Sequence, residues 1–199
     1  MTTYTWPDAY KPQDMELRLM PNTRIIRPMF GGAPQSIEFI GARWQAILTM
    51  PPDDYADRAG LEAWLNRIRG PAHRIALWHM VRPLPRGTRQ TNTTTNATAA
   101  QFASTITAAA TTGETLLAGD MIGIALENST THLAQVVADT TAAASSISIT
   151  FSPPLKWSVA NGAAVTVNKP TATFMLTEPP WFLYRPAIAE PLQIVLEEA

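Results

Sequence analysis

The chain has 199 residues, of which 46% are hydrophobic and 16% charged, with 17 prolines and no cysteine. This is the composition of a folded protein rather than a disordered one, and the length suits one domain or two small ones. The net charge of -1 gives no bulk field toward nucleic acid or anionic lipid, so we expect no sequence-specific nucleic-acid partner. The lack of cysteine excludes disulfides, thiolate nucleophiles and Cys-ligated zinc.

The N-terminus shows no basic segment followed by an apolar stretch, which a secretory leader would have. No window reaches the roughly 18 uninterrupted apolar residues of a membrane span. We therefore expect a protein made in the cytoplasm, without membrane insertion.

Two alternating runs in the first part of the chain predict β-strands. Residues 43–50 alternate between apolar and polar side chains, the pattern of a half-buried strand. The apolar side of this run consists of Trp44, Ala46, Leu48 and Met50. A shorter alternating run covers residues 35–39, and Gly41 is the expected bend between the two.

After Pro51-Pro52 the apolar period changes to that of a helix. Apolar residues recur at the spacing i, i+3, i+4 and i+7, namely Leu61, Trp64, Leu65 and Ile68. Asp53 or Asp54 can cap the start of this helix, and Gly70-Pro71 ends it. The following run, residues 73–79, predicts another strand.

The middle of the chain is poor in charge and rich in Thr, Ala and Ser. Residues 91–98 predict a mobile linker or loop, and residues 139–146 a solvated hairpin loop. The same middle part contains four short β-like runs, at 115–125, 132–137, 146–151 and 163–167. Short runs at such spacing, with Gly and Pro between them, favour a small barrel or sandwich.

The last part predicts two strands, at 173–176 and 192–196, that could pair with the sheet of the first part. The predicted fold is therefore mainly β with one α-helix. A β-sheet domain with one packed helix comprises residues 1–86 plus 170–199, and a small β-barrel-like module is inserted at 87–169. Loop 83–87 and segment 169–170 are the expected crossings between the two.

No group of residues in the sequence predicts catalysis. His73 and His79 are six apart on one predicted strand, so a metal site is one interpretation, but no His-x-His or His-Glu-x-x-His spacing supplies further ligands. Gly119-Asp120 has the pattern of a turn in which the carboxylate accepts backbone N–H bonds. No nucleophile elbow, Walker sequence or dinucleotide-binding glycine pattern is present. We expect no enzyme, no metal site and no cofactor.

The six tryptophans divide into two groups. Trp44, Trp64 and Trp78 fall on apolar faces of predicted elements, which favours the core. Trp6, Trp157 and Trp181 lie beside proline or in expected loops, so these three are the candidates for exposed interface or ligand contacts. Tryptophan is used both to stack on sugars and to anchor protein interfaces, so these residues fit either a carbohydrate ligand or a protein partner.

The order of motifs resembles the tail proteins of long-tailed bacteriophages. The first half of the resemblance rests on Trp6-Pro7-Asp8, Phe30-Gly31-Gly32, Gln35-Ser36-Ile37-Glu38, Gly41-Ala42-Arg43-Trp44-Gln45-Ala46, Pro51-Pro52, Leu61-Glu62-Ala63-Trp64-Leu65 and Arg69-Gly70. The inserted module of these proteins is matched by Leu117-Ala118-Gly119-Asp120, Pro153-Pro154-Leu155-Lys156 and Ala164-Val165-Thr166-Val167. The motifs are short and span most of the chain.

The closest resemblance is to the distal tail protein family, or minor tail proteins of the baseplate hub and adaptor. It implies a β-sandwich-like tail-ring domain and a hexameric ring at the end of the tail. The ring would join the tail tube protein to the baseplate hub protein and receptor-binding apparatus, with side fibres as further contacts. The place implied is the virion tail tip, assembled in the cytoplasm of a bacterial host. The small module departs from relatives that carry a larger sugar-binding-like domain.

Other functions stay open at this point. A tail terminator or connector ring is the nearest alternative. A carbohydrate-binding adhesin module would use Trp157 or Trp181, and a hydrolase would use Asp120, Glu127 or Asp139. Nothing in the sequence pairs these carboxylates, which makes the hydrolase the weakest of the three.

Overall fold

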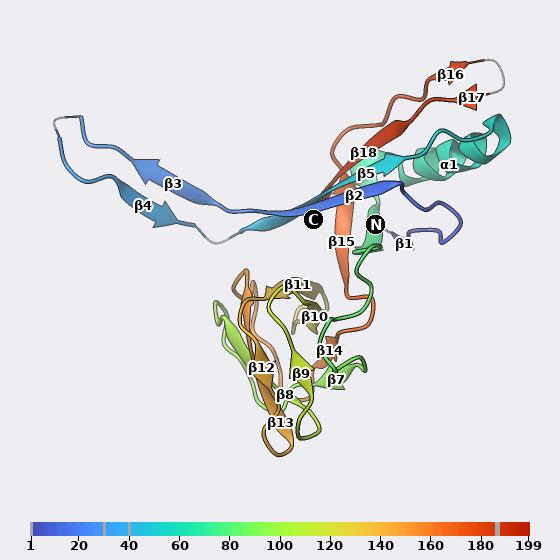
Figure 1. Ribbon diagram of the computed structural model, residues 1–199. Coiled ribbons are helices and arrows are strands. Elements are labelled where there is room, and N and C mark those ends of the chain that lie inside the picture. The colour runs from blue at the N-terminus through green and yellow to red at the C-terminus, as the bar shows by residue number, and fades with distance from the viewer. Residues whose placement is uncertain (1, 30, 40, 186–187) are drawn as a thin grey trace.

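The protein is built mainly of β-strands, with one α-helix in the part of the chain that its structure describes, as the sequence predicts (Figure 1). The structure is a computed structural model that describes residues 2–29, 31–39, 41–185 and 188–199. Most strands belong to two six-stranded sheets, and the remainder form two-stranded ribbons.

The first sheet takes its strands from both ends of the sequence, in the order β1-β6-β15-β18-β5-β2. These strands are β1 (Thr3–Thr5), β2 (Asp14–Met20), β5 (Arg43–Met50), β6 (Arg74–Trp78), β15 (Thr171–Leu176) and β18 (Leu192–Glu198). β1 runs parallel to β6, and the other neighbours are antiparallel. The predicted pairing of the two C-terminal strands with the first part is confirmed, since β15 joins β6 and β18 joins β5.

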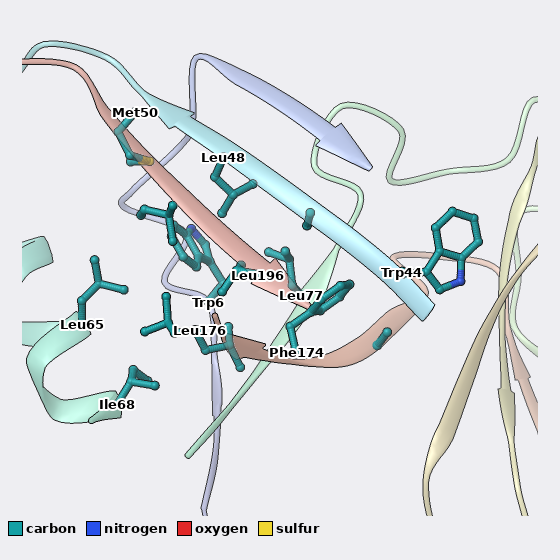
Figure 2. Packing of buried hydrophobic residues seen from close by; sticks show 14 of the residues in the cluster. Trp6, Trp44, Leu48, Met50, Leu65, Ile68, Leu77, Phe174, Leu176 and Leu196 are labelled. Carbon is teal, nitrogen blue, oxygen red and sulfur yellow. The ribbon is translucent and has the colours of Figure 1, made fainter. Parts of the chain in front are cut away.

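One face of this sheet is covered by helix α1 (Tyr55–Ile68) and by the segment around Trp6 (Figure 2). The four apolar residues predicted on one side of β5 are all buried there, and the helix contributes Leu61, Leu65 and Ile68. Trp64 packs edge-on against Trp6, with 5.2 Å between the ring centroids. Trp64 and Trp78 are only half-buried, unlike Trp44.

The prediction that Trp6 is exposed is wrong. Its side chain is 2% exposed, and the indole N–H donates to the Tyr10 carbonyl oxygen at 2.7 Å. Pro7 does follow the end of β1, but the ring turns inward between the helix and the sheet. Trp6 therefore belongs to the core rather than to an exposed contact surface.

The helix ends where the sequence predicts but does not begin with the predicted cap. Asp54 occupies the N-cap position with an extended backbone, yet its side chain makes no capping hydrogen bond. At the other end Arg69 takes a left-handed conformation, with φ of 55°, and Gly70 follows with φ of 61°. The short 3-10 helix η1 (Gly70–Ala72) then leads into β6.

The second sheet forms the inserted module, in the order β7-β14-β10-β11-β13-β8. These strands are β7 (Thr93–Thr94), β8 (Thr105–Ala109), β10 (Met121–Ala125), β11 (Thr131–Val136), β13 (Ser146–Ser152) and β14 (Ala164–Thr166). A bridge between Thr95 and Ala108 brings the two edges of the sheet together, so the sheet nearly closes into a barrel. It encloses a second apolar cluster that includes Ile122, Phe151 and Val165.

Residues 91–98 are not the predicted mobile linker. Thr93 and Thr94 form β7 and pair with β14. Thr95 is buried, and its hydroxyl donates to the Ala160 carbonyl and accepts from the Ala163 N–H. Threonine hydroxyls can satisfy buried backbone groups, so a Thr-rich run can form a strand as well as a loop.

Residues 139–146 are also more ordered than predicted. Thr140–Thr141 forms β12 and pairs with β9 (Thr115–Leu116), and Ala142 is buried. A bridge between Ala143 and Ser146 closes a tight turn. The solvated hairpin loop is thus confined to the last few residues of the predicted stretch.

Two further ribbons extend from the first sheet in different directions (Figure 1). The longer is formed by β3 (Thr23–Ile26) and β4 (Gln35–Glu38), between β2 and β5. The shorter is formed by β16 (Tyr184–Arg185) and β17 (Ile188–Ala189), between β15 and β18. Figure 1 shows the β3–β4 ribbon reaching far to one side of the body and β16–β17 lying on the other.

The two six-stranded sheets share apolar core at their junction. Met121 and Leu133, which lie on β10 and β11, belong to the core cluster of the first sheet. The Trp44 indole N–H donates to the Leu133 carbonyl oxygen at 2.7 Å, and Figure 2 shows Trp44 at the edge of the cluster beside the second sheet. The module is therefore packed onto the first sheet as well as connected to it.

An ion pair strengthens the same junction. One oxygen of the buried Glu198 carboxylate accepts the Trp44 backbone N–H at 3.0 Å, and the other lies 2.6 Å from the Lys156 ammonium. Because Glu198 ends β18 and Lys156 belongs to the module, the pair joins the two sheets.

The two chain crossings lie side by side. The Lys169 N–H donates to the Pro83 carbonyl at 2.7 Å, and the Lys169 ammonium lies 5.2 Å from the centroid of the Trp78 ring. Gly87 approaches the backbone of the module so closely that an added Cβ would lie 2.1 Å from the Thr115 oxygen. A side chain at this position would collide with that backbone, so the close approach of Gly87 fixes the first crossing against β9.

Within the described residues, no helix has the length and apolar character needed to span a membrane.

Replacing Trp44 with Phe tests the junction. The ring is kept but the buried Leu133 carbonyl loses its indole donor, so we expect a loss of about 1–3 kcal/mol in unfolding free energy. Chemical denaturation measures it. Trp157→Phe is the control, because that side chain is 53% exposed and its substitution should change stability by less than about 0.5 kcal/mol. Equal effects for both variants would contradict the proposed contribution of Trp44.

Candidate assembly surface

The β3–β4 ribbon is exposed along its whole length. Every residue of both strands is exposed, and the register pairs Thr23 with Glu38 and Ile26 with Gln35. The pairing continues past the strand, since the Phe39 N–H donates to the Asn22 carbonyl at 2.7 Å. We call residues 21–39 the arm. The sequence pattern predicts its second strand but not its first.

The arm has two unlike faces because side chains alternate along each strand. The register places Arg24, Ile26, Ile37 and Phe39 on one face. Ile26, Ile37 and Phe39 are each between 42% and 47% exposed, and we call these three the apolar face of the arm. The opposite face carries Thr23, Ile25, Ser36 and Glu38, of which only Ile25 is large and apolar.

The apolar face continues onto the module at the root of the arm. Phe39 and Ala42 line a small hollow of about 190 Å³ together with Phe102, Pro153 and Pro154 of the module, and the charged Glu38 and Lys156 line it as well. Phe102 is itself 47% exposed. We call this hollow the corner, because it lies where the arm and the module meet. A mainly apolar surface therefore runs from the arm onto the module.

A second exposed apolar segment leads into the β16–β17 ribbon. Trp181 is 93% exposed and Leu183 61% exposed. The neighbouring Tyr184 is held to the helix, since its hydroxyl donates to the Glu62 carboxylate at 2.5 Å. We call residues 178–185 the Trp181 segment. Its position is fixed by the helix, while its two large apolar side chains face solvent.

The exposed Trp157 lies elsewhere, in a cleft between the two sheets. The cleft has a volume of about 500 Å³ and is lined by polar residues of both sheets, among them Arg74, Asn128 and Thr130. The three tryptophans predicted as contacts are thus not brought together. Trp6 is in the core, Trp157 borders this cleft, and Trp181 lies on its own segment.

The carboxylates considered for a hydrolase make structural hydrogen bonds instead. Asp120 is 3% exposed and accepts the backbone N–H groups of Arg86, Gly87 and Leu117, which confirms its predicted turn role. Asp139 accepts the Ala118 N–H, and Glu127 accepts the Ser158 hydroxyl. Asp120 also ties the first chain crossing to the module.

The histidines are likewise held by local contacts. His73 accepts a hydrogen bond from the Thr2 N–H and His79 from the Arg82 N–H, at the two ends of β6. Burial lowers the pKa of His79, and the nearby Arg82 guanidinium lowers it further. Among the described residues, no group of three or more His, Asp or Glu side chains is placed to hold a metal ion.

His132 is buried within the module near the junction. One ring nitrogen lies 3.0 Å from the Pro153 carbonyl, so that nitrogen carries the proton, and the other has no hydrogen-bond partner. The ring packs edge-on against Phe151. Burial lowers the pKa of His132. The hydrogen bond to the Pro153 carbonyl opposes this shift, the Lys156 ammonium adds to it, and Glu198 opposes it.

Comparison with known proteins adds no assignment. No protein-family model matches the chain, and no curated protein matches it.

Replacing Asp120 with Ala removes the acceptor of three backbone N–H groups. We expect a loss of about 2–3 kcal/mol in unfolding free energy, because a buried donor left unpaired costs about 1–3 kcal/mol, and the Gly87 N–H is buried while the Arg86 and Leu117 N–H groups are partly buried. Asp139→Ala is the matched control, since it removes one exposed bond and should cost far less. An Asp120→Ala protein as stable as the natural one would contradict the structural role of Asp120 and would favour the hydrolase hypothesis.

Acidification should destabilise the protein through its buried histidines. The folded state resists protonation of His132 while the unfolded chain takes up the proton near pH 6.5. The free energy of unfolding should therefore fall between about pH 7.5 and about pH 5.5, by at most about 1.4 kcal/mol per pH unit for each such histidine. Glu114, whose pKa is lowered by the Thr111 N–H and Arg89, does not titrate in this range.

The variant His132→Gln keeps a donor for the Pro153 carbonyl and does not titrate. Thermal denaturation across the same range should show a weaker pH dependence than in the natural protein, with the remainder due to His79. If stability depends on pH as strongly in His132→Gln as in the natural protein, His132 is not the cause of the acid destabilisation.

Proposed function

We propose that the protein is a structural component of the tail of a long-tailed bacteriophage, which assembles into a ring at the distal end of the tail. The ring, of six copies, joins the tail tube protein on one side to the baseplate hub and receptor-binding apparatus on the other. The chain acts by shape and contact, without catalysis or cofactor.

The observation that carries this proposal is the exposed arm. An isolated two-stranded ribbon is at best marginally stable in water, and this one carries exposed apolar side chains along one face. Met29, near its tip, is 90% exposed. Exposed apolar patches of this kind mark contacts with another protein. The arm is therefore a surface that requires a partner.

The arrangement of the exposed surfaces favours a ring over a two-fold dimer. The arm extends to one side of the body and the Trp181 segment lies on another (Figure 1). Contacts between unlike surfaces are head-to-tail, and such contacts close into rings when the rotation allows. The rigid junction at Trp44 and Glu198 supports this, because a ring closes reproducibly only if each copy keeps its shape.

The position at the tail tip rests on the motif resemblance. Several residues of the resembling motifs have structural roles. Trp44 and Ala46 lie in the core of the first sheet, and Leu61 and Leu65 lie on the buried side of the helix. Asp120 holds the first chain crossing. A tail terminator or connector ring would use the same assembly surfaces at another place in the particle.

A carbohydrate-binding module is a second candidate, favoured by the cleft beside Trp157. A half-exposed indole next to Arg74, Asn128 and Thr130 offers a stacking surface with hydrogen-bonding groups around it. In this case tryptophan fluorescence should respond to soluble oligosaccharides of the bacterial surface, and Trp157→Ala should remove the response.

The mass of the purified protein in solution tests the ring. Light scattering should find a species of six times the 21.7 kDa chain, and negative-stain images of it should show a central hole. Ile37→Glu, which places a charge on the apolar face, should reduce assembly, whereas Ile25→Glu on the opposite face should not. A single-chain mass over the whole accessible concentration range would contradict the proposal.

A further inference from the structure

We propose that the apolar face of the arm and the corner bind the Trp181 segment of the next copy in the ring. This inference rests on the proposed ring and names the two surfaces that meet in it. The first is formed by Ile26, Ile37 and Phe39 with Phe102, and the second by Trp181 and Leu183.

The two surfaces belong to different copies because they cannot meet within one chain. The arm leaves the body at the end of β2 and the start of β5, and the Trp181 segment follows β15 and is held against the helix. Figure 1 shows the arm and the β16–β17 ribbon extending from the body in opposite directions. Each copy therefore presents one surface to each neighbour, which gives the contact a direction.

The shapes of the two surfaces are complementary. The corner is hollow, with the arm as one wall and Phe102, Pro153 and Pro154 of the module as the other. The Trp181 segment presents two large side chains outward from a fixed base. Tryptophan seated in an apolar hollow is a frequent centre of binding energy at protein interfaces. Trp181 and Leu183 are thus suited to enter the corner and lie along the arm.

The charges of the two surfaces are also complementary. Arg24 lies on the same face of the arm as Ile26 and Ile37. The Trp181 segment begins with the exposed Glu178, while Arg185 near its end is paired with Glu190 at 2.7 Å. Because Arg185 is neutralised by Glu190, Glu178 is the charge of the segment that can face Arg24 of the next copy. Such a pairing favours the contact and sets its orientation.

Cross-linking through introduced cysteines tests the contact directly, because the chain has no cysteine of its own. The double variant Ile37→Cys, Leu183→Cys places one cysteine on the arm and one on the Trp181 segment, the two surfaces that the proposal brings together. Treatment with a short bismaleimide should join successive copies, so a denaturing gel should show a ladder of covalent multimers. The single variants should not give a ladder.

The matched control is Ile25→Cys, Leu183→Cys. Ile25 is more exposed than Ile37 but lies on the opposite face of the arm, so it should give little ladder. A ladder from the Ile37 pair and not from the Ile25 pair supports the proposed contact. Equal ladders, or particles of ring mass without a ladder, overturn the contact while leaving the ring intact. A natural protein that stays monomeric overturns both.

A charge exchange gives a second test that needs no cysteine. Glu178→Arg should raise the protein concentration needed for assembly by about tenfold, because it places a positive charge opposite Arg24. Adding Arg24→Glu should restore assembly toward the natural level. Assembly unaffected by Glu178→Arg, or not restored by the second change, would overturn the pairing even if the ring forms.

Discussion

A two-stranded ribbon has no second layer of its own to cover apolar side chains, and the arm of this protein is such a ribbon. Its strands satisfy each other's backbone groups, so the arm can keep its form. Its apolar face can only be covered by another surface. The proposed ring rests on this constraint, because in the ring another copy would cover the apolar face of the arm.

The body of the protein is built so that the arm has a fixed origin. The first sheet and the module share core residues, and Trp44 and Glu198 connect them by a hydrogen bond and an ion pair. Asp120 and the contact between Lys169 and Pro83 hold the two crossings in place. The corner is one result, since it exists only while the arm root and the module keep their relative position.

The parts of the fold that follow from local pattern can be predicted from sequence. The alternation at 43–50 and the helical spacing from Leu61 to Ile68 are strong signals, because one side of each element is buried in a single large core. The Thr-rich β7 cannot be recognised in this way, since its stability comes from pairing with distant strands and from the Thr95 hydroxyl. The strand β2 is a different case, because its alternation is present in the sequence and could have identified it.

The candidate site is less predictable than the fold. The position of Trp181 beside proline correctly indicates exposure, but the same reasoning fails for Trp6, whose direction depends on packing between helix and sheet. The arm cannot be recognised as a surface from its sequence, because its exposure is a property of the whole fold. Ile37 and Phe39 look like core residues in the sequence, and only their place on an uncovered ribbon makes them candidates for an interface.

Hydrogen exchange of the arm is the most direct test of the claim that it is completed by another copy. The amides of residues 21–39 would be compared between dilute protein and the assembled fraction, with the buried strands β5 and β18 as internal references. If another copy covers the arm, exchange is fast in the free chain and strongly slowed on assembly, at the arm and at the Trp181 segment together. Assembled particles in which the arm exchanges as fast as in the free chain would contradict the claim.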